Sequence, residues 1–143
     1  MTITTKGNLN QALNRLLIKK NMVVKTGIQD NSYDIHGKSN AVKAYLNEYG
    51  TKTIPPRPAM RNTVADFKAE WIKTFKAYLA SGRGIEFTLN VVGEQMKTDM
   101  VYTYTMFKEP PNAKSTIRKK GFDKPLDDTG AMINSITSEV DEE

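Results

Sequence analysis

The segment from Ile54 to Pro58 reads IPPRP and places three prolines within five residues. Proline has no amide donor, and it biases the residue before it toward an extended backbone. The segment therefore cannot lie inside a helix or in a central strand. We predict a stiff, extended arm over residues 52–61, with regular structure on either side of it.

Helical periodicity is strongest directly after the arm. From Met60 to Ala80 apolar residues recur every three or four positions, which predicts the longest helix, ended by SGRG at residues 81–84. We expect its apolar stripe to be core and not a cofactor site: Val64, Phe67, Trp71, Ile72, Phe75, Tyr78 and Leu79. Before the arm, Ala41–Tyr49 predicts a shorter helix with Gly50 as its C-terminal cap. Its apolar face holds Val42, Tyr45, Leu46 and Tyr49.

The first 39 residues predict a helix, a strand and a loop. An amphipathic helix within residues 1–21 has Asn8 as its cap, and its apolar face holds Leu9, Ala12, Leu13, Leu16 and Leu17. Met22–Ile28 alternates and is rich in β-branched residues, which predicts a strand. Residues 29–39 are polar and predict a loop or hairpin tip that holds His36, the only histidine, as a turn residue.

Residues 85–107 fit two patterns. Ile85, Phe87, Leu89 and Val91 alternate as in a strand, whereas Leu89, Val92, Met96, Met100 and Tyr104 have helical spacing. We predict a helix from Phe87 to Phe107.

The last third of the chain predicts short elements joined by loops. Residues 108–115 (KEPPNAKS) form a second stiff, polar loop, and Ser115 or Thr116 caps one helical turn that Gly121 closes. Ile133–Val140 alternates as a strand. An acidic tip follows at Asp141, Glu142 and Glu143.

These elements predict an α+β protein. We expect a single compact domain over residues 1–143, with a long central helix, further amphipathic helices and a small, mostly antiparallel sheet, besides the proline arm and a basic loop at residues 108–130. The chain has 143 residues and a mass of 16.1 kDa, which is enough to bury a core without metal or disulfide.

Composition excludes several kinds of site. The chain has no cysteine and one histidine, so disulfides, thiol nucleophiles, thiolate zinc sites and two-histidine metal sites within one chain are ruled out. We predict no catalytic residue, cofactor or metal. The first 21 residues lack the features of a signal peptide, and no apolar run approaches the length of a membrane span, so we expect a cytoplasmic product with no membrane partner.

Asp128 lies in Asp-Thr-Gly-Ala, the sequence around the catalytic carboxylate of retroviral-type aspartic proteases. Such an enzyme needs two of these carboxylates side by side, each held after a buried apolar strand. Here Lys124, Pro125 and Asp127 make a charged turn before Asp128, and only 13 residues follow Gly130. We therefore predict no enzyme. A structural cap on a short helix is expected from Asp128, Thr129 and Gly130.

A basic cluster lies between Ala113 and Lys124. Five basic residues stand against Asp123, for a local charge of +4: Lys114, Arg118, Lys119, Lys120 and Lys124. The whole chain carries +5 at pH 7. Such a cluster suits phosphates or an acidic partner, and it equally suits a solvated loop. The acidic residues from Glu139 to Glu143 offer a complementary charge that favours pairing of subunits.

Two ordered motifs carry a family resemblance. They are LNEYGTKTIPPRPAMR, at residues 46–61, and PPNAKSTIRKKGFDKPLDDTGAMINSI, at residues 110–136. In these two motifs and their order, the chain resembles the phage virion morphogenesis family, the neck or tail-completion proteins of tailed bacteriophages. The resemblance covers roughly Val23 to Val140. The chain departs from the family pattern at Ala59, Asp127 and Met132, which affects local packing.

The resemblance implies a non-enzymatic virion protein at the head-to-tail connection or the top of the tail, assembled in the host bacterial cytoplasm. The implied partners are copies of the chain in a ring (hexamer favoured, dodecamer possible), neighbouring connector, stopper, tail-terminator or tail-tube proteins, and genomic DNA that passes through the lumen without sequence recognition. The alternative is a small basic nucleic-acid-binding module.

Residues for these contacts follow from the motifs. Contacts with other subunits or partners are expected from Ile54, Pro55, Arg57, Pro58, Arg61, Pro110, Pro111 and Asn112. Contacts with DNA are expected from Lys114, Arg118, Lys119 and Lys120. Stiff arms lose little conformational entropy on docking, and opposite charges at two ends suit a head-to-tail contact that closes into a ring.

Overall fold

A computed structural model describes residues 21–29 and 31–142. The helix predicted within residues 1–21 lies outside these ranges except for its last residue, and so does Glu143. The described elements are β1 (Met22–Ile28), α2 (Asn40–Tyr49), α3 (Ala59–Ala80), α4 (Ile85–Met106), α5 (Lys114–Lys120), α6 (Ala131–Asn134) and β2 (Ile136–Glu142). The predicted α+β class is confirmed, with an antiparallel β1–β2 ribbon.

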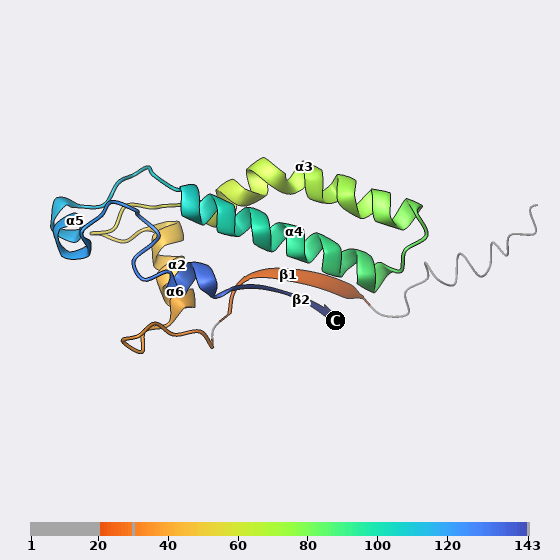
Figure 1. Cartoon of the computed structure of the whole chain (residues 1–143), viewed down its shortest axis with the longest axis horizontal. Helices are drawn as coiled ribbons and strands as arrows, with labels where there is room; N and C mark the ends of the chain where they lie inside the picture. Colours follow the sequence, from red (N-terminus) through yellow and green to blue (C-terminus); the bar gives the residue numbers. More distant parts are fainter. Residues whose placement is uncertain (1–20, 30, 143) are drawn as a thin grey trace, which may run out of the picture.

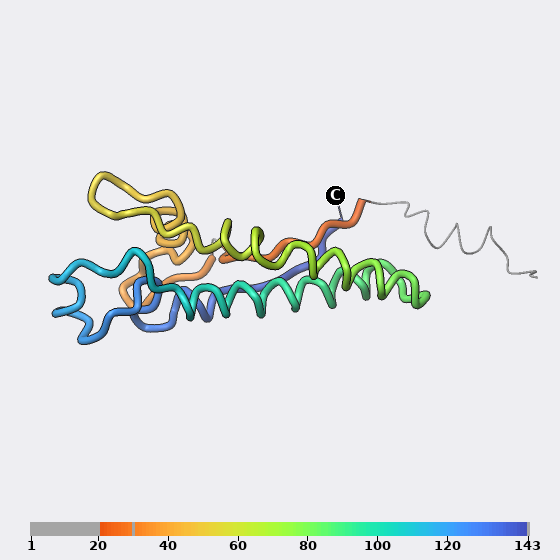
Figure 2. The backbone as a smooth tube through the Cα atoms, turned by 90° about the horizontal axis from the view of Figure 1, so that it is seen from above, coloured from red at the N-terminus to blue at the C-terminus, as the bar shows by residue number. Residues whose placement is uncertain are grey.

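Helix α4 is the central layer. It packs against α3 on one side and against the β1–β2 ribbon on the other (Figure 1). Viewed from above, α3 and α4 run along most of the molecule, and the proline arm and α5 gather at one end (Figure 2). The long helix after the arm is confirmed. Residues 85–106 are helical, so the strand alternative for this segment is wrong.

The ribbon turns one face to α4 and the other to water. Its register sets Val24 opposite Val140 and Ile28 opposite Ile136. Because side chains alternate along a strand, Val24 and Ile28 share a face with Ile136, which is buried in the core. The other face is polar and includes an ion pair between Lys25 Nζ and Asp141 Oδ2 at 3.0 Å.

The two long helices are joined by side chains on facing turns. The indole Nε1 of Trp71 donates to Asp99 Oδ2 at 2.7 Å, and the rings of Phe67 and Tyr102 meet edge to face at 6.4 Å. These contacts set the rotation of α3 about its axis. Part of the predicted stripe is not core, since Val64 and Ile72 remain exposed.

The main core lies toward the end of α4 that precedes the basic loop. It consists of Ala59, Met100, Tyr104, Leu126 and Ile136. Burial raises the pKa of the Tyr104 hydroxyl, and the nearby charge of Glu48 raises it further. The core therefore joins the start of α3, the last turns of α4 and the start of β2.

The predicted helix before the arm is confirmed as α2. The face that it buries is not the one predicted from its apolar residues. The face predicted as apolar is largely open to water: Val42, Tyr45 and Tyr49 are 53, 63 and 60% exposed. The buried residues are Asn40, Ala44 and Glu48. The predicted cap Gly50 is confirmed, with φ of 74° and its amide donating to Leu46 O at 2.9 Å.

Two local predictions in the last third of the chain need correction. Helix α5 begins at Lys114 after Ala113, so Ser115 and Thr116 lie inside its first turn and do not cap it, while Gly121 closes it as predicted. The last strand begins at Ile136 and not at Ile133, because residues 131–134 form α6. β2 begins at Ile136 because this residue pairs with Ile28, the last residue of β1.

The turn before α6 also differs from the prediction. Gly130 itself occupies the cap position with φ of 74°, and no side chain caps the helix. Asp127 Oδ1 accepts from the Gly130 amide at 3.1 Å, and Thr129 Oγ1 accepts from the Ala131 amide at 3.4 Å. Asp128 is therefore not the cap, because the left-handed backbone at Gly130 lets the neighbouring residues satisfy these amides.

Candidate interaction site

The carboxylate of Glu48, at the end of α2, caps the start of α3 on the far side of the proline arm. Glu48 is 4% exposed, and its oxygens accept from the amides of Met60 at 3.0 Å and Arg61 at 3.1 Å. The first amides of a helix lack partners within the helix, and α3 has no side-chain cap of its own. Glu48 thus holds the end of α2 against the start of α3.

The side chain of Arg61 also binds Glu48. Its Nε donates to Glu48 Oε1 at 3.0 Å and its Nη2 donates to the Glu48 carbonyl at 2.8 Å. The guanidinium also lies 5.2 Å from the centre of the Tyr49 ring. Arg61, predicted as a contact between subunits, is bonded within its own chain.

The turn between Glu48 and the prolines is held by Gly50 and Thr51. Thr51 Oγ1 accepts from the amides of Thr53 and Ile54, at 3.2 and 3.0 Å. A Cβ on Gly50 would lie 2.9 Å from both Ile54 O and Pro56 N, which are backbone atoms. Glycine is therefore required here by space as well as by its positive φ.

Arg57 joins the proline arm to the basic loop. Its side chain donates to two successive carbonyls, from Nε to Pro110 O at 3.0 Å and from Nη2 to Pro111 O at 2.8 Å. The residue is 6% exposed, and burial lowers its pKa while the charge of Asp123 raises it. Two motifs that lie more than 50 residues apart therefore form one unit, which we name the arm–loop unit (residues 47–61 and 108–130).

Internal bonds also order the loop itself. Asp123 Oδ1 accepts from the Asn112 amide at 3.0 Å. Lys120 Nζ donates to the carbonyls of Lys124, at 2.8 Å, and Asp127, and it lies 5.0 Å from the centre of the Phe122 ring. Lys120 was predicted to face DNA. It is half-buried and bonded within its own loop, and its contact with DNA stays a prediction.

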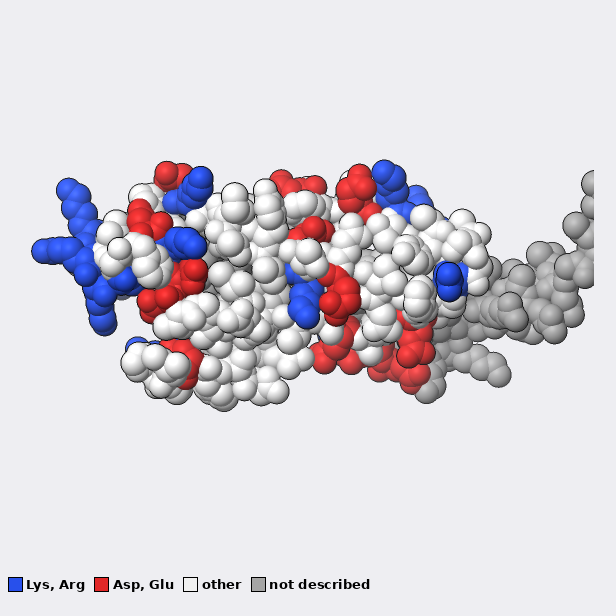
Figure 3. All heavy atoms as spheres, viewed as in Figure 1, with Lys and Arg blue, Asp and Glu red and all other residues white. Residues whose placement is uncertain are grey.

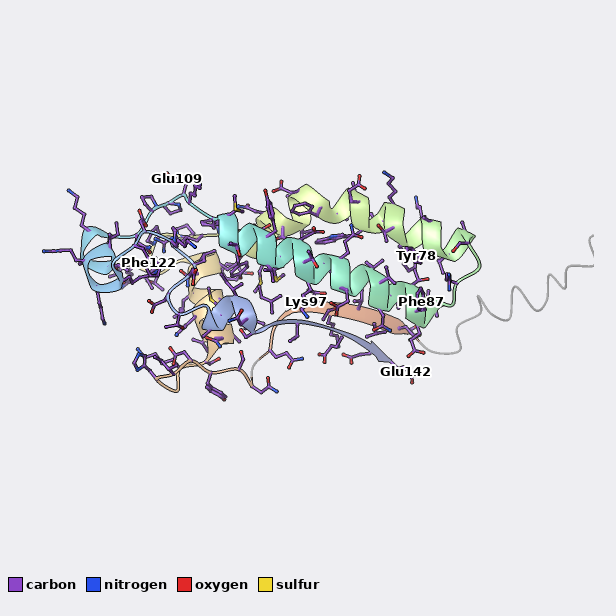
Figure 4. The ribbon with its side chains drawn as sticks, in the orientation of Figure 1. Tyr78, Phe87, Lys97, Glu109, Phe122 and Glu142 are labelled. Carbon is purple, nitrogen blue, oxygen red and sulfur yellow. The ribbon has the colours of Figure 1, made fainter. Side chains whose placement is uncertain are left out.

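The other three predicted DNA contacts project from the end of the molecule. Lys114, Arg118 and Lys119 are exposed on α5. Basic side chains extend outward at this end (Figure 3), and Phe122 and Glu109 lie at the same end (Figure 4). We name Lys114, Arg118 and Lys119 the basic tip. Its three cations are held by a braced loop and point away from the core.

The region of Asp128 borders a cavity of about 230 Å³ between α2 and residues 125–132. Asp128 is exposed on one wall, and Lys43, Asn47 and Leu46 line the other. Within residues 21–29 and 31–142, no three histidine, cysteine or acidic residues are grouped so as to hold a metal ion.

The loop before α2 is fixed by Asp34. Its Oδ1 accepts from the amides of His36 at 2.8 Å and Lys38 at 2.9 Å, and its Oδ2 pairs with Lys43 Nζ. The hydrogen bond from Lys43 and then the Lys38 amide hold the pKa of Asp34 well below its usual range. His36 is an exposed turn residue, as predicted.

Sequence reasoning missed the residues that brace this region. Glu48, Asp99 and Asp34 each bind a group on another element or turn, and pairings of this kind have no local signal. The structure brings Arg57 together with Pro110 and Pro111, all three of which were predicted as outward contacts. Ile54 and Pro58 are half-buried, whereas Pro55 is exposed. Contacts between subunits stay a prediction.

Comparisons with known proteins found no relative: no family model, curated protein or solved structure matches this chain. The resemblance to phage neck and tail-completion proteins therefore depends on the motifs alone. Among the described helices, none is both long and apolar enough to cross a membrane.

Proposed function

We propose that the protein is a non-enzymatic structural component of a tailed-phage virion, built into the neck or the tail top as a closed ring around the DNA passage. The observation that supports this most is the arm–loop unit. Arg57 and Glu48 fasten the two motif segments into a rigid end that presents three exposed cations. Pre-ordered surfaces lose little entropy when a partner docks.

The surface between subunits is proposed to include the exposed face of α2. The rings of Tyr45 and Tyr49 lie 4.8 Å apart, and Val42 continues the same face one turn earlier. Tyrosine is enriched in protein interfaces because it buries a large area at low entropic cost, whereas a helix in water usually presents charged residues. In a ring, this face meets a different surface of the next copy, so the contact is heterologous.

Arg57 and Arg61 are unsuitable for testing this interface. Both are bonded inside the chain, so their replacement would loosen the arm whether or not it touches a neighbour. Exposed residues of α2 separate the two effects. The variant is Val42→Lys with Tyr45→Lys, and the matched control is Ala69→Lys with Ala77→Lys on the exposed side of α3.

The mass of the purified protein by light scattering, alone and with portal-complex or tail-tube preparations, tests the proposal. We expect a ring mass in at least one condition, retained by the control and lost by the α2 variant without loss of helicity. A wild-type protein that stays monomeric in every condition would overturn the ring. An α2 variant that assembles normally would overturn only the assigned interface.

The basic tip favours a second candidate, a freestanding nucleic-acid-binding module. Three exposed cations on a chain of charge +5 suit phosphate contacts. A monomer that binds duplex DNA tightly, with an affinity that falls steeply with salt, would favour this candidate over the ring.

A further inference from the structure

The β1–β2 ribbon has two outer edges with unused backbone groups. Every second residue of an antiparallel strand points its amide and carbonyl away from the partner strand. Among the described residues the sheet has two strands, and α4 covers one of its faces (Figures 1 and 2). Lys25 and Glu142 aside, no residue of either strand has a backbone hydrogen bond outside the ribbon in this part of the chain. Both edges can therefore accept a further strand.

Three features that commonly protect an edge strand are absent from the ribbon. Natural edges are often short, or interrupted by a proline or a bulge. Here both strands have seven residues, slightly more than the average strand, and neither contains proline. Pairing runs one to one from Met22 and Glu142 to Ile28 and Ile136, so no bulge bends either edge. A straight, continuous edge of this kind is a template for pairing with another chain.

Charge is the remaining protective feature, and its sign differs between the two strands. The single charged residue of β1 is Lys25, whereas β2 carries Glu139, Asp141 and Glu142. Lys25 lies opposite Glu139, and both share the water-facing side of the ribbon with Asp141. Like charges on adjacent strands destabilise their pairing, and opposite charges stabilise it. Two β1 edges or two β2 edges therefore repel each other, whereas a β1 edge and a β2 edge attract.

The surface beside Lys25 is also open to a neighbouring strand. Gly27 is two residues further along β1 on the same side, and nothing lies within 4 Å of a Cβ added there. A glycine inside a strand often marks a place at which another backbone approaches closely. Side chains of a third strand next to β1 would therefore meet no obstacle at this position.

We propose that the outer edge of β1 pairs with the outer edge of β2 of a second copy of this chain. The contact joins two different surfaces, so it is heterologous, and it repeats from copy to copy until a ring closes. Closure leaves no edge strand exposed, as in a barrel. The inference rests on the proposed ring for this closure and adds a backbone contact to the subunit interface.

Hydrogen–deuterium exchange of the wild-type protein, resolved to single residues by mass spectrometry, tests the pairing. The outward amides of residues 22–28 and 136–142 should exchange at least tenfold more slowly in the assembled protein than in the dilute monomer. The turn at residues 81–84 serves as the control and should exchange equally in both. A ring whose outward strand amides exchange as in the monomer would overturn the edge pairing and leave the ring standing. Protection of these amides already in the dilute monomer would also overturn it, because the edges are then covered within one chain.

Charge reversal on one strand at a time tests the choice of edges. Lys25→Glu makes both edges acidic, and Glu139→Lys with Asp141→Lys makes both edges basic. We expect neither variant to assemble alone, and an equal mixture to recover at least half of the wild-type ring fraction by light scattering. The charges within each chain are the same alone and in the mixture, so recovery reports contact between chains.

A matched pair of variants reverses charges on the exposed side of α3, with Lys76→Glu as one and Asp66→Lys with Glu70→Lys as the other. Each of these should assemble alone. Ribbon variants that assemble alone as fully as the wild type, or a mixture of them that stays unassembled, would overturn the edge pairing. Failure of the proposed ring has a different result, since the wild-type protein itself would then give no ring mass in any condition.

Discussion

Glu48 shows how one side chain can determine the position of an arm. Its carboxylate accepts from the amides of Met60 and Arg61, twelve and thirteen residues later, although it belongs to the preceding helix. A buried carboxylate is unfavourable unless its oxygens are bonded, and these amides would otherwise lack partners. Arg61 supplies the opposite charge. The acid, the arginine and the end of the helix are therefore stable only together.

Replacing Glu48 by alanine should lower the free energy of unfolding by about 2–3 kcal/mol, because two helix amides and Arg61 lose their acceptor. The shift of the urea midpoint measures this loss. Glu70→Ala, which removes only an exposed i,i+3 pair with Lys73, should change stability by less than about 0.5 kcal/mol. Similar losses in both variants would contradict the assigned role of Glu48.

Tyr104 should make the protein sensitive to alkali. Burial, and then the charge of Glu48, raise its pKa in the folded state. Stability from this group is complete below the unfolded pKa of about 10 and is lost as pH rises toward the folded pKa, because the unfolded chain releases the proton first. Urea midpoints at pH 8 and pH 11 should differ more in the wild type than in Tyr104→Phe. Tyr33→Phe, on an exposed loop, serves as the control.

At the scale of elements, close approach of α4 to the ribbon depends on Gly93. The residue is buried in the helix, and an added Cβ would meet Ser138 Oγ and, at 2.8 Å, Val24 Cγ2. Both strands thus press on one position of the helix. Packed interiors accommodate extra atoms poorly, so a larger side chain at position 93 would push the helix and the ribbon apart.

Gly93→Ala should therefore destabilise the protein by about 1–3 kcal/mol, despite the better helix propensity of alanine. Thermal unfolding followed by circular dichroism measures the effect. Gly84→Ala, where nothing lies within 4 Å of the added Cβ, should stay close to the wild type. A stabilised Gly93→Ala variant would show that the helix and ribbon are not packed this closely.

At the scale of the whole molecule, two groups of charge in the described part of the chain lie apart along the long axis. The basic tip lies at one end, and β2 carries Glu139, Asp141 and Glu142 toward the other end (Figures 1 and 3). Asp141 already pairs with Lys25, and Glu139 accepts from Gln29 Nε2 at 3.3 Å. One of the ribbon acids is therefore paired with a cation and another is hydrogen-bonded within the chain, whereas the basic tip is exposed and attracts phosphates at long range.

Replacement of all three basic-tip residues by glutamine should reduce the dependence of DNA binding on salt. Each lost phosphate contact lowers the slope of log K against log salt by about 0.9, so a change of roughly 2–3 is expected. Filter binding to duplex DNA over a range of salt, with the assembled protein, measures it. The control replaces Lys68, Lys73 and Lys76, which are exposed on α3. An equal change in both variants would argue against a specific role of the tip.

The sequence by itself determined the elements whose causes are local. Three prolines exclude helix and central strand from Ile54–Pro58, apolar spacing predicts α3, and alternation predicts β1, because each of these depends on neighbours within a few residues. The tip cations could likewise be named from the sequence. Residues 85–107 could not be assigned from local pattern alone, because strand alternation and helical spacing fit them equally well.

Only the tertiary structure decided which of these faces and charges meet. The apolar face of α2 stays in water because Asn40, Ala44 and Glu48 point to the core, and Arg57 turns inward because two carbonyls of a distant loop lie within reach. Lys120 turns inward for the same reason. Burial of a polar group depends on partners brought together by the fold, and the separation of those partners along the chain leaves no periodic trace.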